Sequence, residues 1–459
     1  MVRYMGVSAK YDIAIVGAGI AGLYCCLNAH PDKKIGLFEA SHKIGGRIET
    51  VDMEGFFAEY GSMRFDPSRQ FLMQKLIQDL GLETEHFPEY SSPSIQNRQT
   101  IYNLKEREKE LTTLELIKVA IQRVLDKSEE QLLSMNEEEL DHIRREAKYK
   151  GEYLWKQGLW SIFSDVLSFD AIKFLIIEGS FYHSIHENPN SVEWMIVMIK
   201  MFQMSKNLKG IKNGMQQLTN TMFEKIKEKG VVVYKQHTLQ DLSSSGGKDI
   251  ILLFNNGKTF KTKHVILAIP QKSLLSVNSL PDNIKLLLHS VMSIPLLKCF
   301  FVVKNPWWKQ NVPNEGLTTF PARELHYYKH GGKGNIMVYC DRPYITFWSE
   351  YVKAEFHDKT ELSRNEELPK MFAHLMKIDP SDIIICGIRD WGKEPYGGAY
   401  HIWKPGIQSW IVIDKLTSFA LREDSPKNIH ICGEAFSDYQ GFMEGALRSA
   451  RNVMAEIQI

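Results

Sequence analysis

Three glycines near the N-terminus have a spacing that suits phosphate binding. They form the pattern G-x-G-x-x-G directly after an apolar run over residues 13–16, and they are Gly17, Gly19 and Gly22. Glu39 follows 22 residues after the first of them, at the end of a second apolar run. Glycine lets the backbone approach a pyrophosphate, a helix N-terminus favours its charge, and a carboxylate accepts hydrogen bonds from a ribose. The segment therefore predicts a dinucleotide site on a strand, turn, helix and strand.

Two further glycine-bearing blocks lie far apart in the chain. Gly46 and Arg47 belong to the block IGGRIET, and Gly433 and Glu434 belong to the block ICGEAF near the C-terminus. Glycine again permits close backbone approach, and an arginine can reach a phosphate. The glycine pattern by itself does not separate NAD from FAD.

The order of these blocks resembles the flavin-dependent amine oxidase superfamily, of the monoamine oxidase and L-amino acid oxidase type. The matching blocks are VGAGIAGL, FEA, IGGRIET, ICGEAF and GFMEGALRSA. Within the superfamily, SIPLLKC, PWW and MEGALRSAR are most similar to the violacein-pathway L-tryptophan oxidases. The resemblance implies bound FAD, hydride transfer from an amine-bearing carbon and reoxidation by oxygen to give hydrogen peroxide. It implies these FAD contacts: Gly17, Gly19, Gly22, Glu39, Gly46, Arg47, Gly433 and Glu434, with Thr238 near the adenine.

The resemblance also assigns a lysine and two aromatic residues to the chemistry. Lys298 matches the family lysine that assists the reaction with oxygen, and an ammonium there would stabilise developing superoxide charge. Tyr400 and Phe442 match two aromatics that wall the amine and exclude water. The segment YGGAY has Ala399 where membrane monoamine oxidases attach FAD through cysteine, so non-covalent FAD is expected.

Arg64 narrows the expected substrate. An arginine fork suits bidentate capture of a carboxylate, and the resemblance places Arg64 and Tyr339 where L-amino acid oxidases grip the substrate carboxylate. The sequence therefore predicts an FAD-dependent L-amino acid oxidase that releases 2-oxo acid, ammonia and hydrogen peroxide. The alternative for Arg64 is a structural role, in which it pairs with Glu59, Asp66 or a flavin phosphate. An amine or polyamine oxidase, an amino acid 2-monooxygenase and a flavoprotein without turnover are the alternatives for function.

Composition excludes several other classes. The 459 residues carry 56 basic and 55 acidic side chains, which gives no general attraction to nucleic acid or anionic membranes. The six scattered cysteines have neither disulfide nor metal-site spacing, so we expect reduced thiols and no metal. No secretion signal or run of about 18 apolar residues is evident, so we expect no membrane contact and a cytoplasmic location. The expected partners are the amino acid, oxygen and a second copy of the chain in a homodimer.

The coarse element pattern predicts an α/β fold. Strands are predicted at residues 231–234, 250–254, 265–269 and 428–431, and a terminal helix from about Glu444. Residues 106–126 predict one amphipathic helix, the charged run 127–150 a solvated helix pair, and 163–202 buried helices. Residues 291–304, 335–339 and 344–348 predict a second sheet.

These elements predict a discontinuous Rossmann-like FAD-binding domain over residues 1–90, 205–275 and 425–459. An inserted α+β substrate-binding domain is expected over residues 276–424. A helical insertion is expected over residues 91–204. This arrangement is the flavin amine oxidase type that the resemblance implies.

Overall fold

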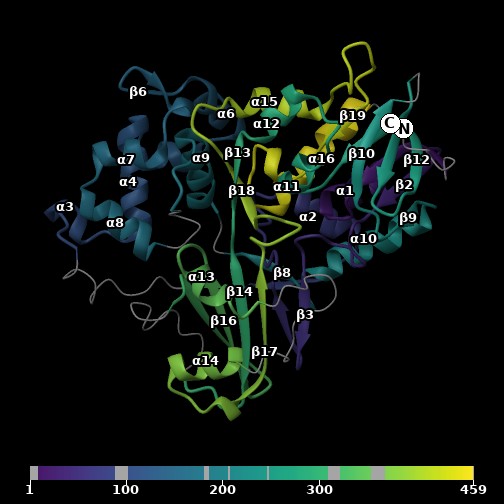
Figure 1. The fold of residues 1–459 in the computed structure, drawn as a ribbon. Helices are drawn as coiled ribbons and strands as arrows, with labels where there is room; N and C mark the ends of the chain where they lie inside the picture. Colours follow the sequence, from purple (N-terminus) through teal and green to yellow (C-terminus); the bar gives the residue numbers. More distant parts are fainter. Residues whose placement is uncertain are drawn as a thin grey trace.

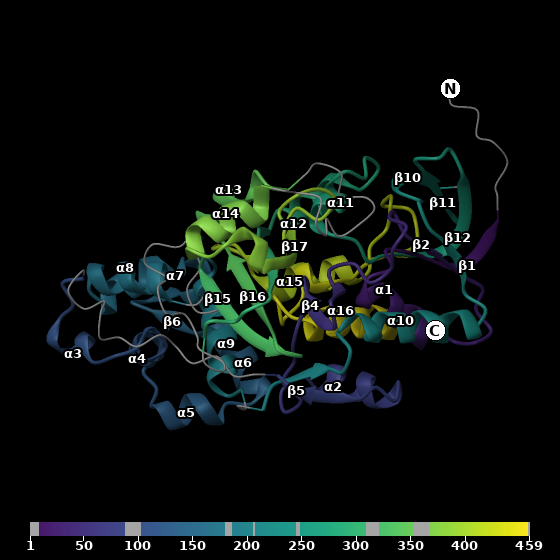
Figure 2. The ribbon, with the colours of Figure 1, turned by 90° about the horizontal axis from the view of Figure 1, so that it is seen from below.

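The computed structural model describes residues 9–87, 102–179, 186–204, 207–244, 248–308, 321–352 and 367–457. Figure 1 shows three parts of the molecule: a group of helices drawn in blue on the left, a mixed sheet with its helices on the right, and a second sheet below and between them. Figure 2 gives the same arrangement after a quarter turn. No helix of the described ranges is long and apolar enough to cross a membrane.

The mixed sheet joins segments from both ends and the middle of the chain. Its order is β10-β11-β12-β1-β2-β9, with β19 also paired to β12. β1, β2, β9, β12 and β19 run parallel, while β10 and β11 form the antiparallel edge. The strands are β1 (Lys10–Val16), β2 (Ile35–Phe38), β9 (Val232–Tyr234), β10 (Leu239–Ser244), β11 (Ile250–Phe254), β12 (Thr259–Leu267) and β19 (Ile429–Ile431). The strands predicted for this sheet are thereby confirmed.

Helices cover the mixed sheet through an apolar core. Buried residues of α1 (Ile20–Asn28), α10 (Gln216–Glu228), α2 (Phe71–Asp79) and α16 (Met443–Ile457) share one cluster with β1 and β2. The predicted terminal helix is therefore present, and its buried face includes Leu447, Ala450 and Val453. The other face of the sheet packs against α11 (Gln271–Leu275), α12 (Asp282–Leu288) and α15 (Ser409–Thr417).

The second sheet is antiparallel with the order β15-β16-β14-β17. Its strands are β14 (Leu297–Val303), β15 (Glu324–His330), β16 (Lys333–Cys340) and β17 (Ile383–Asp390). One face packs against α13 (Tyr344–Ser349) and α14 (Glu367–Met376). The opposite face packs against the hairpin of β3 (Thr50–Met53) and β4 (Phe56–Glu59), which brings N-terminal residues beside this sheet.

Two predictions for the second sheet were wrong. Residues 344–348 form α13 rather than a strand, because a short aromatic run fits a buried helix as well as a strand. Residues 291–304 do not all belong to the second sheet, since Pro295 follows β13 (Val291–Ile294) and only β14, which begins at Leu297, joins that sheet. β13 pairs instead with β18 (Tyr400–Trp403).

The middle of the chain is helical, as predicted. It contains α3 (Glu106–Lys109), α4 (Thr113–Leu125), α5 (Glu129–Ser134), α6 (Glu137–Glu146), α7 (Leu159–Val166), α8 (Phe169–Glu178) and α9 (Ser191–Phe202). The single helix predicted over residues 106–126 is divided, because Thr112 and Glu115 form a capping box that starts α4 afresh. Two small antiparallel sheets complete the strands: β5 (Thr84–His86) with β8 (Lys209–Ile211), and the hairpin of β6 (Lys148–Tyr149) with β7 (Glu152–Tyr153). The domain limits stay a prediction.

The charged run 127–150 contains the predicted helix pair, but it ends in β6 and includes a buried arginine. Most of α5 and α6 is exposed, but the Arg144 side chain is only 6% exposed and donates to both carboxylate oxygens of Glu193 on α9. A buried guanidinium needs such a partner, because an unpaired buried charge is strongly unfavourable. The run is therefore not solvated throughout, and it anchors α6 to α9.

Candidate functional site

A cleft of about 600 Å³ opens at the carboxyl ends of β1, β2 and β12. Ligands of open α/β sheets bind at this edge, where the backbone turns away from the sheet. The cleft is lined by all but one of the cofactor residues expected from the sequence: Gly17, Gly19, Glu39, Gly46, Arg47, Thr238, Gly433 and Glu434. Gly22 is absent from the lining.

The glycines divide into two groups according to what a Cβ atom would meet. A Cβ on Gly22 would lie 1.9 Å from the carbonyl oxygen of Gly17, and one on Gly17 would lie 2.3 Å from that of Ala268. These two glycines allow the turn to pack on itself. A Cβ on Gly19 would meet only the Gly46 Cα atom, at 4.0 Å, and one on Gly433 would meet nothing within 4 Å. Those positions leave room for a ligand close to the backbone.

Glu39 is held with its carboxylate at the edge of the cleft. Its two oxygens accept hydrogen bonds from the backbone N–H groups of Ala18 and Ser41, each at 2.8 Å. A carboxylate has about four acceptor positions, so it retains capacity for the two hydroxyls of a ribose. With the glycine cradle beside it, this donor and acceptor set fits a dinucleotide such as FAD.

Arg47 and Glu434 meet at the inner end of the cleft. Arg47 Nη1 donates to a Glu434 carboxylate oxygen at 2.9 Å and to the Ala399 carbonyl oxygen at 2.8 Å. Glu434 also accepts from the backbone N–H groups of His401 and Gly441, and His401 Nδ1 lies 2.9 Å from it. Burial alone would raise the pKa of Glu434, but His401 and Arg47 hold it at about 2. The carboxylate is therefore an anion that joins three distant segments.

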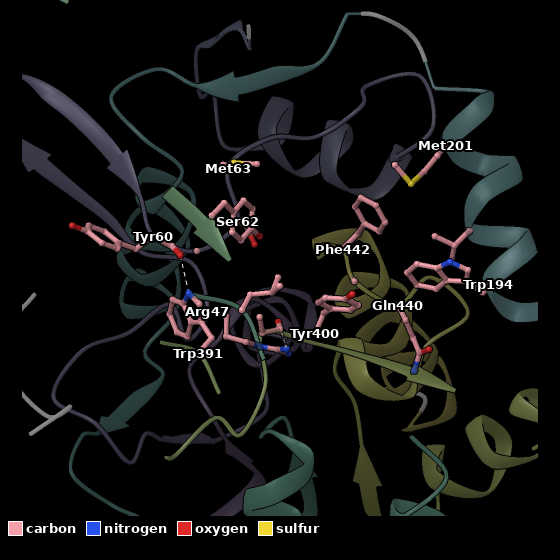
Figure 3. A pocket seen from close by; sticks show the side chains of 16 residues that line it. Arg47, Tyr60, Ser62, Met63, Trp194, Met201, Trp391, Tyr400, Gln440 and Phe442 are labelled. Atoms are coloured by element: carbon pink, nitrogen blue, oxygen red, sulfur yellow. Dashed lines mark hydrogen bonds between the residues drawn. The ribbon is translucent and has the colours of Figure 1, made fainter. Parts of the chain in front are cut away.

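A smaller cavity of about 100 Å³ adjoins the cleft, and Figure 3 shows it from close by. Both spaces are lined by Arg47, Ser62, Trp391, Ala399, Gly441 and Phe442. Tyr400 and Phe442, the two predicted aromatics, both line this inner cavity, and so does Tyr339 from β16. The structure therefore brings three of the five predicted catalytic residues to one small space.

Helix α9 supplies a wall of the inner cavity that the sequence analysis did not find. Trp194, Val197 and Met201 lie on one helical face at spacings of three and four residues, and all three line the cavity. That periodicity was visible in the sequence, but it is equally typical of ordinary core packing. Gln440 and Met63 also line the cavity.

Lys298 lies behind the inner cavity rather than in its wall. Its side chain is 2% exposed, and its ammonium donates to the carbonyl oxygens of Glu59 and Gly61 at 2.8 and 2.7 Å. The ammonium also lies 4.7 Å from the centre of the Tyr339 ring. Burial lowers the pKa of Lys298 to about 7, against the opposing effect of Glu59. Gly61 and Tyr339 line the cavity and both contact Lys298, so the lysine is separated from the cavity by these lining residues.

Arg64 is close to these residues but lines neither cavity. Its guanidinium carbon lies 5.4 Å from the centre of the Phe87 ring, and the preceding residue, Met63, is in the cavity wall. The positive charge of Arg64 acts on Lys298 and His326, and it contributes to the lowered pKa of each. Its role in binding a carboxylate stays a prediction.

The second sheet aligns charged residues that the sequence analysis did not connect. Cross-strand pairing sets Glu324 opposite Tyr339, Tyr339 opposite Lys298, and Lys298 opposite Arg389. Arg389 forms a two-pronged ion pair with Glu49, at 2.6 and 2.7 Å, and both residues line the cleft. Trp391, two residues further on, donates its indole N–H to the Tyr60 carbonyl oxygen at 2.7 Å. These cross-strand neighbours depend on the register of the strands, which the sequence analysis did not predict.

The inner cavity has no acidic lining among the residues that the structure describes. Its one charged lining residue is Arg47, and Lys298 and Arg64 lie just outside it. Within the same described ranges, no group of three or more histidine, cysteine, aspartate or glutamate residues could hold a metal ion. All six cysteines are buried and free in the structure.

Comparison with known proteins adds three findings. The family described as "Flavin containing amine oxidoreductase" matches residues 20–458. The chain is 26% identical to an L-amino-acid oxidase of Naja atra over 96% of this chain and 87% of that protein. It is 24% identical to an uncharacterised protein of Acanthamoeba polyphaga mimivirus, over 97% of this chain and 94% of that one.

Among solved structures, putrescine oxidase bound to putrescine has a similar fold. The TM-score is 0.69 at 17% identity, and the match covers 98% of this chain and 99% of the other. The predicted α/β fold of the flavin amine oxidase type is therefore confirmed.

The two groups of glycines predict different effects of adding one methyl group. Gly22→Ala forces a Cβ against a backbone oxygen and should destabilise the protein by about 1–3 kcal/mol. In Gly19→Ala the added Cβ meets no such contact, so the free energy of unfolding should change by less than about 0.5 kcal/mol. The affinity for flavin should nevertheless fall at least about tenfold. Urea unfolding and flavin fluorescence titration measure the two quantities. An equal loss of stability in both variants would contradict the assignment of Gly22 to turn packing and of Gly19 to ligand binding.

Proposed function

The chain belongs to the flavin containing amine oxidoreductase family, and on that premise we propose that it is an FAD-dependent L-amino acid oxidase. When bound, the flavin of such an enzyme accepts a hydride from the carbon that carries the amine and passes the electrons to oxygen. The product imino acid hydrolyses to a 2-oxo acid and ammonia, and oxygen becomes hydrogen peroxide. The similarity to the L-amino-acid oxidase of Naja atra supports this choice.

The charge around the inner cavity is the observation that carries the proposal. Arg47 lines the cavity, Lys298 and Arg64 lie beside it, and none of the described lining residues is acidic. A substrate carboxylate is attracted by such surroundings, because charges interact strongly where water is excluded. A diamine would instead place a second ammonium where no described lining residue offers a counter-charge.

Each predicted residue has a place in the proposed reaction. Arg64 and Tyr339 hold the carboxylate. Tyr400 and Phe442 orient the amine and keep water away, which favours the neutral amine. Lys298 stabilises negative charge on oxygen as it is reduced. The residue at the position of flavin attachment, Ala399, has no nucleophile, which supports non-covalent FAD.

An amine oxidase is the second candidate, because the fold matches putrescine oxidase bound to putrescine. Amino acid 2-monooxygenase activity differs from oxidase activity only in the fate of the imino acid, so it is recognised by an amide product. The likeness to L-tryptophan oxidases stays a prediction, and the apolar wall of α9 supports a preference for large apolar side chains.

A peroxide assay tests the proposed function directly. The purified flavoprotein should produce hydrogen peroxide with at least one of the twenty L-amino acids, with the corresponding 2-oxo acid in equal amount. Putrescine, spermidine and tyramine should give at most a few per cent of that rate. Faster turnover of any of these amines than of every L-amino acid would favour the second candidate.

Arg64→Ala tests the carboxylate grip. It should raise KM for the preferred L-amino acid at least about tenfold, the loss of one charged hydrogen-bonding partner, while the amine-only analogue of that substrate changes little. Arg69→Ala is the matched control, because Arg69 follows five residues later and lines neither cavity. An unchanged KM for the amino acid in Arg64→Ala would refute the assignment.

The lowered pKa of Lys298 predicts the pH dependence of the oxygen reaction. The side chain is an ammonium below about pH 7 and a neutral amine above it. Reoxidation of the reduced protein, followed by stopped flow, should therefore slow as the pH rises through about 7. Lys298→Met should be slow at every pH, because its side chain has a similar shape without the charge. A profile in the variant parallel to that of the unaltered enzyme would exclude the lysine.

A further inference from the structure

Residues 437–442 form the loop that ends one wall of the inner cavity. The loop connects a 3-10 turn (Glu434–Phe436) to α16, and its residues Gln440, Gly441 and Phe442 line the cavity. Tyr439 belongs to the same loop, is 4% exposed and lines neither cavity. Its ring meets that of Phe442 edge to face, with centres 5.3 Å apart at 75°. Tyr439 therefore touches a cavity aromatic from behind.

Two cations hold the Tyr439 ring. Lys200 Nζ lies 4.6 Å from the ring centre, and the Arg448 guanidinium carbon lies 4.8 Å from it. Glu137 accepts from both cations, at 2.8 Å from Lys200 and 3.3 Å from Arg448. The carboxylate lets two cations share one ring, which their mutual repulsion would otherwise oppose.

This cluster connects two elements that line the inner cavity. Lys200 is on α9, the helix whose Trp194, Val197 and Met201 line the cavity, and Arg448 is on α16 behind Phe442. A second connection runs parallel to it, since Arg144 bonds to Glu193 of α9 and to the Asp438 carbonyl oxygen of the loop. The spacing between α9 and Phe442 therefore depends on ionic contacts outside the cavity.

We propose that Tyr439 is a positioning residue, clamped by Lys200, Arg448 and Glu137, that fixes Phe442 relative to α9 and so sets which substrate side chains are accepted. This proposal rests on the proposed function, because it takes an L-amino acid as the ligand between these walls. Lys200 thereby lets the helical segment influence specificity from a residue that does not line the inner cavity.

Substitution of the ring tests the proposal. Tyr439→Leu should raise KM for L-phenylalanine about three- to tenfold, with kcat changed less than twofold, because an edge-to-face partner of Phe442 is lost. The preference for L-phenylalanine over L-alanine, as a ratio of kcat/KM, should fall by the same factor. Tyr439→Phe keeps the ring and should restore both values. Flavin content and the thermal midpoint are measured for each variant.

Substitution of a cation provides a second test that leaves the loop intact. Lys200→Met should lower the same preference about two- to threefold. Lys118→Met is the matched control and should have no effect, because Lys118 also lies over a ring, that of Phe202, and pairs with Glu129, but none of these three lines a cavity.

The outcomes separate the two proposals. An unaltered enzyme without activity on any L-amino acid would refute the proposed function, and the same variants would then be compared on a large and a small primary amine. An unchanged preference in both Tyr439→Leu and Lys200→Met would overturn the positioning role. Equal impairment of Tyr439→Phe and Tyr439→Leu would also overturn it.

Discussion

The buried carboxylate of Glu434 is the constraint on which the site depends. A carboxylate in a protein interior is stable only when charge and hydrogen bonds replace its lost water. Glu434 receives Arg47 from the N-terminal block, His401 from β18 and the Gly441 N–H from the loop before α16. Each of these partners belongs to a different part of the chain, and each adjoins a residue of a cavity wall. One anion thus fixes where the cleft ends and where the inner cavity begins.

The remaining walls are set by elements that Glu434 does not reach. The second sheet contributes Tyr339, with Lys298 packed behind it, because cross-strand register places those two side chains together. The helical segment contributes Trp194, Val197 and Met201 on α9, which is tied to the loop through Arg144 and Lys200. The site is therefore assembled from three units whose relative positions depend on buried ionic contacts. Such contacts specify a single arrangement more strongly than apolar packing does, because an unpaired charge has few acceptable alternatives.

The parts of this structure that depend on local physics could be predicted from the sequence. The turn at Gly17 and Gly22 follows from steric limits within a few residues, and the Thr112 cap that divides the helix over residues 106–126 has a local signature as well. Residues 344–348 show the limit of local patterns, because a short aromatic run fits a strand and a buried helix equally well. Arg144 shows a different limit. Its burial requires Glu193, which lies 49 residues away, and no charge pattern within α6 records that partner. The α9 wall was missed for a related reason, since the same periodicity is typical of a core.

The similarity of the fold to known enzymes says less about the identity of the substrate than the charge of the cavity does. A fold supports many chemistries, so a TM-score of 0.69 to putrescine oxidase at 17% identity leaves the substrate open. Charge is more restrictive, because a substrate that enters a dry cavity leaves its water behind and must find compensation from the protein. Here the described surroundings offer Arg47, Lys298 and Arg64, with Glu434 already engaged by four hydrogen-bond donors. An additional ammonium would meet no acidic side chain in the described lining of the inner cavity, whereas a carboxylate would lie near these cations. The charge of the cavity lining therefore supports the proposed amino acid substrate over a diamine, independently of the fold.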